Sequence, residues 1–159
     1  MPIYYVTNKK PLSHNKKGSR EEYKQPFRDE FNLKYSRLYK NLPIENDKLK
    51  SRIIYIHQLK PGNTPDVDNL SKPIVDAFSG VMYEDDRQII ERSAVILERK
   101  EFDFVIVDAT NMPLEIYEDF NTYYEEKAEH IILFGIDTVL PSAIKIGEIW
   151  LWKLEWMKF

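Results

Sequence analysis

The stretch Pro65-Asp66-Val67-Asp68-Asn69-Leu70-Ser71-Lys72-Pro73-Ile74-Val75-Asp76 carries a group of charged side chains at the start of a predicted helix and along it. Residues 60–66 contain Pro, Gly and Asn, which mark a break between regular elements. The apolar residues Leu70 and Ile74 then recur at helical spacing. We therefore expect a helix over about residues 69–78, entered through an extended segment that holds two aspartates.

These two aspartates are candidate metal ligands. In extended backbone, side chains two residues apart point the same way, so Asp66 and Asp68 face one point with Cα atoms ~7 Å apart. Two such carboxylates repel each other, and a cation between them removes the repulsion. Hard oxygen ligands with no Cys or His nearby suit Mg²⁺ or Mn²⁺. Lys72, in the first turn, is placed to support charge on a visiting phosphate.

Each of these residues also has a structural interpretation. Asp and Asn are favoured helix caps, so Asp66 to Asn69 can serve only to begin the helix, and Lys72 can be an ordinary solvated residue. The acidic run from Glu84 to Asp86 can be a polar turn. A calcium-binding EF-hand loop is excluded, because the positions that require Gly and Glu hold Ser71 and Ala77.

The rest of the chain mixes strands and helices without regular alternation, which indicates an α+β fold. Strands are expected at residues 3–7, 52–59 and 131–135, and at 88–99 and 102–108 as an antiparallel pair joined by a turn at 99–101. Further helices are expected at about 26–39 and 114–128. Alternating Trp150, Trp152, Leu154 and Trp156 indicate a last strand, with the tryptophans as core or interface residues.

Charge is distributed unevenly along the chain. Residues 1–60 hold 14 Lys and Arg against 6 Asp and Glu, whereas residues 101–159 hold 4 against 12. This asymmetry indicates a first half that faces a polyanion, although chance clustering of solvated charges gives the same counts. The chain has no cysteine, no apolar run long enough to span a bilayer and no secretory signal pattern, so we expect a cytoplasmic protein.

Three groups of residues resemble the core signature of the RusA-type Holliday junction resolvases. They are the run Asp66-Val67-Asp68-Asn69-Leu70-Ser71-Lys72, the triplet Asp76-Ala77-Phe78 and the run Tyr83-Glu84-Asp85-Asp86-Arg87-Gln88-Ile89. The segment from Pro11 to Asn15 and the pair Phe27-Arg28 are similar to further family elements. The resemblance covers about residues 1–108, which we take as a RusA-like core.

The resemblance implies a homodimer that cuts Holliday junctions or related branched DNA in recombination and repair, by Mg²⁺-dependent hydrolysis of phosphodiester bonds. It assigns the metal-ligand role to Asp66, Asp68 and Asp86 and the role of essential lysine to Lys72. Asp86 matches the ligand position better than Asp85. Asp76 also matches a family position: eight residues past Asp68 on the helix, it either lies near the site or only supports Lys72 or a helix contact. No role is assigned to any of the three histidines.

The chain departs from the family pattern in two places. Only one basic residue, Lys60, lies in the stretch just before the first aspartate, where members often have several. Contacts to DNA are therefore expected from the N-terminal loop, at Lys9, Lys10, Ser13, Asn15, Lys16, Lys17 and Arg20. The acidic and aromatic residues 109–159 do not align with the family, and we expect an added helix and strand packed on the core. Alternatively they extend the dimer interface, bind a protein partner or keep nucleic acid off one face.

Two other functions are compatible with the same residues. The carboxylates would equally serve a metal-dependent phosphohydrolase that acts on nucleotides, or a nuclease for flaps and single strands. A non-catalytic protein that binds branched DNA is the third option, although clustered acids near a polyanion argue against it. Cleavage of four-way junctions, flaps, duplexes and free nucleotides, with and without Mg²⁺, separates these options.

Overall fold

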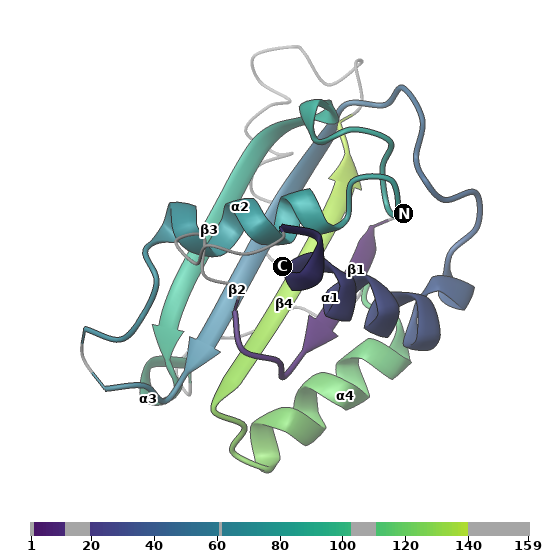
Figure 1. The fold of residues 1–159 in the computed structure, drawn as a ribbon. Helices are drawn as coiled ribbons and strands as arrows, with labels where there is room; N and C mark the ends of the chain where they lie inside the picture. The colour runs from purple at the N-terminus through teal and green to yellow at the C-terminus, as the bar shows by residue number, and fades with distance from the viewer. Residues whose placement is uncertain (1, 12–19, 61, 103–110, 140–159) are drawn as a thin grey trace, which may run out of the picture.

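The computed structural model describes residues 2–11, 20–60, 62–102 and 111–139. Their strands form one four-stranded mixed sheet in the order β1-β4-β2-β3 (Figure 1). The strands are β1 (Ile3–Thr7), β2 (Leu49–His57), β3 (Ile89–Glu98) and β4 (His130–Thr138). β4 is antiparallel to both of its neighbours, whereas β2 and β3 are parallel. The predicted α+β class is confirmed.

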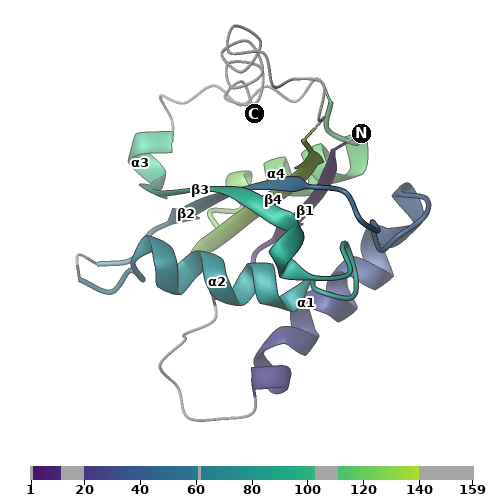
Figure 2. The same ribbon diagram turned by 90° about the horizontal axis from the view of Figure 1, so that it is seen from above.

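Helices pack on both sides of this sheet. They are α1 (Arg20–Lys34), α2 (Val67–Ala77), α3 (Arg99–Phe102) and α4 (Leu114–Glu125), with 3-10 turns η1 (Ser36–Leu38) and η2 (Asp86–Gln88). Figure 2 shows α1 and α2 on one side of the sheet and α4 on the other. Within the described ranges, no helix combines the length and apolar character needed to cross a lipid bilayer.

Helix α2 connects the two parallel strands. β2 and β3 pair in continuous register from Lys50 opposite Glu91 to His57 opposite Glu98. A connection between parallel neighbours has to run back along the sheet before the second strand begins. The start of α2 therefore follows the carboxyl end of β2, and its end precedes the amino end of β3.

Several expected boundaries are wrong in detail. α1 begins at Arg20 and contains Pro26, which was expected near its start, and it ends at Lys34 before η1. Residues 99–101 form part of α3 where a turn between two strands was expected. The observed partner of β3 is the parallel strand β2. Residues 103–108 and the tryptophan segment lie outside the described residues.

Strand β4 lies in the middle of the sheet. It pairs with β1 from Ile132 to Ile136 and with β2 along its whole length. Ile131 to Ile136 are buried, so this segment completes the central core. The division expected at residue 108 therefore does not follow a boundary in the sheet.

An aromatic cluster fills the core between the sheet and the two helices α1 and α2. Tyr5 of β1 makes edge-on contacts with the rings of Phe27 and Phe31 of α1 and of Phe78 at the end of α2. Burial raises the pKa of the Tyr5 hydroxyl, which stays protonated and donates a 2.6 Å hydrogen bond to Glu30. The cluster fixes the end of α2 against β1 and α1.

The turn after α2 is tied down at both ends. Gly80 has φ +84°, a left-handed conformation that favours glycine. The buried Tyr83 hydroxyl donates to the carbonyl of Val75 in α2. Gln88 Nε2 donates to the carbonyl oxygen of Ile44 at 3.1 Å, and the Glu84 amide donates to the same oxygen at 3.3 Å. Residues 79–88 are therefore held in one position relative to α2.

Replacing Phe78 tests the aromatic cluster. Phe78 is fully buried and also stacks on Phe134 of β4, so Phe78→Ala leaves a cavity and costs about 3–5 kcal/mol of unfolding free energy. Leu33→Ala is the control, because Leu33 is 83% exposed, and it changes stability by less than about 0.5 kcal/mol. Urea unfolding measures both, and equal stabilities of the two variants would contradict the described core.

Candidate active site

Asp66 caps the start of α2. Its backbone is extended, with φ −74° and ψ 171°, and its Oδ1 accepts a 2.7 Å hydrogen bond from the Asn69 amide. Oδ2 accepts a longer bond, 3.3 Å, from the Asn69 side-chain amide. The cap interpretation of this aspartate is thus confirmed. A carboxylate has about four lone-pair sites, so the same group keeps room for a cation.

Asp68 lies within the first turn of α2. The helix begins at Val67, two residues earlier than expected, because the cap is Asp66. The expectation that Asp66 and Asp68 face one point from extended backbone is therefore wrong, since Asp68 is helical. Both carboxylates remain near the positive end of the helix dipole, which favours anionic side chains there.

Lys72 lies on the same side of α2 as two of the acids. Asp68, Lys72 and Asp76 follow at intervals of four residues within one helix, so their side chains form a row along its surface. Asp68 and Lys72 are exposed, and Asp76 is half-buried. The row places a flexible ammonium between two carboxylates without burying any of the three.

Asp85 is occupied by local contacts. Its side chain accepts bonds from the Arg87 amide at 2.9 Å and from Arg87 Nη2 at 2.7 Å, and it caps η2. The hydrogen bond from Arg87 holds the pKa of the Asp85 carboxyl well below its usual range. Asp85 therefore stabilises the η2 turn. This favours Asp86 over Asp85 as the carboxylate of the pair that could bind an ion.

Asp86 lies against Asp76. Burial, followed by the neighbouring carboxyls of Asp85 and Asp76, raises the pKa of Asp86. Asp76 belongs to the last turn of α2, and the fixed turn at 79–88 brings Asp86 beside it. Two carboxyl groups this close make it costly for both to be ionised.

The acidic residues form two groups at opposite ends of α2. Ten residues separate Asp66 from Asp76, which corresponds to about 15 Å along the helix axis. In the described part of the chain, no three Asp, Glu or His side chains lie close enough together to hold a metal ion. The donor chemistry suits Mg²⁺, but one protomer does not gather Asp66, Asp68 and Asp86.

Comparison with known protein families identifies the family to which the chain belongs. A family profile described as Endodeoxyribonuclease RusA matches residues 7–106. The chain belongs to the RusA family. The match spans both acidic groups, Lys72 and the whole β2-α2-β3 unit, so the expected relationship is confirmed. None of the curated proteins matches the chain.

The family match ends before α4 and β4. β4 is nevertheless central to the sheet, so the RusA-like region takes its core from residues beyond the match. The resemblance to RusA resolvases identified the acidic motif, but it gave no indication of this strand order. Nothing in the local sequence signals that residues 130–138 insert between β1 and β2.

Most of the residues expected to contact DNA lie outside the described residues. Ser13, Asn15, Lys16 and Lys17 lie in residues 12–19, and only the backbone of Arg20 is described. Lys9 and Lys10 are exposed beyond the end of β1, and Lys9 Nζ lies 3.9 Å from Glu30. These residues stay predictions, with Lys9 partly neutralised by its acidic neighbour.

The contact between Asp76 and Asp86 was not foreseen. Asp76, eight residues past Asp68, was expected either near the site or as a support for Lys72 or a helix contact, but not beside Asp86. The available signal was its place at the end of the helix, directly before the turn that carries Asp86. That turn returns to α2 because Tyr83 is buried against it.

The raised pKa of Asp86 predicts a pH-dependent stability. The folded protein holds this proton more tightly than the unfolded chain, so unfolding free energy falls as pH rises above about 4. Asp86→Asn removes the repulsion and should stabilise the metal-free protein at pH 7 by on the order of 0.5 kcal/mol, since solvent screens the pair. Urea unfolding in EDTA from pH 4 to 7 tests this.

The stability advantage of Asp86→Asn should shrink towards pH 4. Glu118→Gln, at an exposed position on α4, is the control for loss of one surface carboxylate. An Asp86→Asn variant that is less stable than wild type at pH 7 would contradict the repulsion between Asp86 and its neighbours.

Proposed function

We propose that this RusA-family protein is a metal-dependent endonuclease that cleaves Holliday junctions or related branched DNA during recombination and repair in the cytoplasm. The observation that carries the proposal is the family match, which spans Asp66, Asp68, Lys72 and Asp86 together. The intact acidic set argues for catalysis, because a protein that only binds DNA gains nothing from carboxylates that repel phosphates.

Asp66, Asp68 and Asp86 are the proposed ligands of Mg²⁺, with Mn²⁺ as a substitute. All three offer hard carboxylate oxygens, and the described neighbourhood contains no thiolate. When bound, the ion supplies a water of lowered pKa and offsets charge on the scissile phosphate. The raised pKa of Asp86 supports this assignment: burial is its largest cause, and the neighbouring carboxyls, whose repulsion a cation would offset, add to it.

Lys72 is the proposed electrostatic partner of the reacting phosphate. It is exposed, it shares the face of α2 with Asp68, and no ion pair within the described ranges involves it. Its ammonium is therefore available to a phosphate that approaches the start of α2. There it stabilises the negative charge that develops as the phosphodiester is attacked.

A homodimer completes the proposed site. Within one protomer Asp86 contacts Asp76, about 15 Å along α2 from Asp66. We infer that Asp66 and Asp68 of one protomer meet Asp86 of the other, so that each dimer contains two composite sites. A two-fold axis relates these sites, and this symmetry suits a four-way junction in which two strands are nicked equivalently.

Asp68→Asn tests the catalytic assignment. The variant keeps the size of the side chain but loses the charge that holds the ion, so cleavage of a synthetic four-way junction should fall at least 100-fold, the usual order for loss of a group that orders the catalytic ion. Binding to the same junction in EDTA should change little. Single-turnover gel assays with and without Mg²⁺ measure the rate, and a binding titration measures affinity.

The same assay identifies the preferred substrate class when it includes flaps, plain duplexes, single strands and free nucleotides alongside the junction. Glu118→Gln is the matched control and should cut at the wild-type rate. Undiminished junction cleavage by Asp68→Asn would refute the site. Junction binding by wild type without any Mg²⁺-dependent cutting would instead indicate a non-catalytic binder.

Mixed dimers test the composite site. Asp68→Asn and Asp86→Asn are each expected to be inactive alone. When the two are unfolded and refolded together, a mixed dimer holds one site with both mutations and one intact site. Cleavage should then recover to about a quarter of the wild-type rate per protein, because roughly half of the dimers are mixed and each has one active site. No recovery would show that each protomer forms its own site.

A further inference from the structure

Gln88 closes the turn that carries Asp86. Its side-chain Oε1 accepts a 3.0 Å hydrogen bond from the Asp85 amide, and its own backbone amide donates a 3.0 Å bond to the Asp85 carbonyl oxygen. Together with the Asp85 side chain, these bonds form a capping box around η2. Asp86 lies between the two residues of this box, so its backbone is restrained from both sides.

The same side chain attaches the turn to a second segment of the chain. Gln88 Nε2 donates hydrogen bonds to the carbonyl oxygens of Ile44 and Asp47, at 3.1 and 3.0 Å. This segment leads directly into β2, whose first residue, Leu49, pairs with Ile89 of β3. The turn is therefore fixed at the point where the two parallel strands begin to pair.

The amide group of Gln88 matches these partners chemically. Its oxygen accepts one bond and its nitrogen donates two, which uses both N–H groups. The reverse orientation of the amide would set its oxygen against two carbonyl oxygens, so the partners determine which atom is which. A carboxylate of the same length lacks the donors, and an ammonium lacks the acceptor. The half-buried Gln88 therefore has a side chain that joins the turn to the segment before β2.

Asp86 needs such a restraint because its charged neighbours are acidic. The carboxyls of Asp76 and Asp85 lie beside its own. Repulsion between ionised carboxyls favours a turn that moves Asp86 away from the other two. Such a movement of η2 would break the bonds from Gln88 to the segment before β2, so these bonds oppose it.

We propose that Gln88 is a positioning residue that holds Asp86 in place for the divalent ion without touching the ion or the DNA. The inference rests on the proposed nuclease function, in which Asp86 is a metal ligand. Gln88 acts through the backbone of the turn, and the three hydrogen bonds of its side chain keep the carboxylate where it is. Contacts that orient a ligand in this way typically contribute about 10–100-fold to metal affinity or activity.

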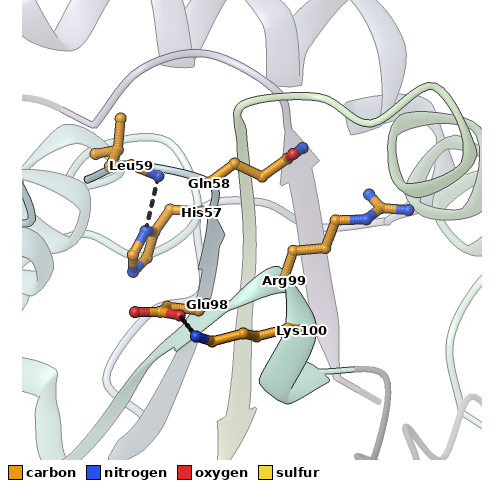
Figure 3. Close-up of a pocket in the computed structure, with 6 residues that line it drawn as sticks. All are labelled: His57, Gln58, Leu59, Glu98, Arg99 and Lys100. Atoms are coloured by element: carbon orange, nitrogen blue, oxygen red, sulfur yellow. Dashed lines mark hydrogen bonds and ion pairs between the residues drawn. The ribbon is translucent and has the colours of Figure 1, made fainter. Parts of the chain in front are cut away.

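Gln58 offers a matched control at the other end of β2. Figure 3 shows it next to His57, the last residue of the strand. Its Nε2 also donates to two carbonyl oxygens, those of Lys127 and Ala128, at 2.8 and 3.1 Å. Gln58→Met therefore removes the same kind of bonds as Gln88→Met, but at the opposite end of the strand.

Mn²⁺ binding measured by electron paramagnetic resonance tests the inference without any cleavage. Methionine has the length of glutamine but no amide, so Gln88→Met should raise the Mn²⁺ dissociation constant about tenfold. Gln88→Asn keeps the amide on a side chain one methylene shorter, and its dissociation constant should lie between those of wild type and Gln88→Met. Gln58→Met should bind Mn²⁺ within twofold of wild type.

Hydrogen exchange in EDTA gives a second measurement that needs no metal. In Gln88→Met the Asp85 amide loses its acceptor and should exchange about tenfold faster than in wild type, whereas Gln58→Met should leave it unchanged. Urea unfolding establishes that each variant is folded. If Gln88→Met does not fold, Gln88→Asn decides between the outcomes.

The outcomes separate this inference from the proposed function. Wild-type Mn²⁺ affinity in folded Gln88→Met would overturn the positioning role and leave the nuclease proposal standing. Equal losses of affinity in Gln88→Met and Gln58→Met would also overturn it, because they would reflect a general loss of stability. A wild-type protein that binds no Mn²⁺ would refute the proposed metal site itself.

Discussion

The parallel pairing of β2 with β3 is the constraint on which the arrangement of the acidic residues depends. It forces α2 to run back along the sheet, and a helix of 11 residues is a rigid spacer of about 16 Å. The aspartates before the helix and those after it are therefore kept at separate ends. Among the described residues of one chain, the two groups therefore do not come together around a single point.

Packing in the core fixes the distance between the two groups of aspartates. Phe78 anchors the end of α2 among Tyr5, Phe31 and Phe134, while the Tyr83 hydroxyl ties the following turn back to Val75. Asp86 consequently lies beside Asp76, where burial and the neighbouring carboxyls raise its pKa. Carboxyls with perturbed pKa values gather at functional sites. The repulsion at this end of α2 thus agrees with a cation-binding role.

Much of the site could be predicted from local sequence, whereas its spatial arrangement could not. The acidic motif, the buried positions Leu70 and Ile74 and the α+β class follow from residue types and spacing, which are local properties. The exact start of α2 was missed because Asp66 and Asp68 are both plausible caps, and only backbone geometry separates them. The central position of β4 depends on pairing with strands some 80 and 130 residues earlier in the chain, which no local pattern encodes.

The segment that follows the family match has two physical roles. β4 supplies the strand that pairs with both β1 and β2 and carries buried core residues, so the acidic unit has no complete core without it. α4 meets the carboxyl ends of the parallel strands through Gln58 and Arg99, on the side from which the chain proceeds to Asp66. Changes in α4 would therefore act on the carboxyl ends of β2 and β3 without altering the acidic residues themselves.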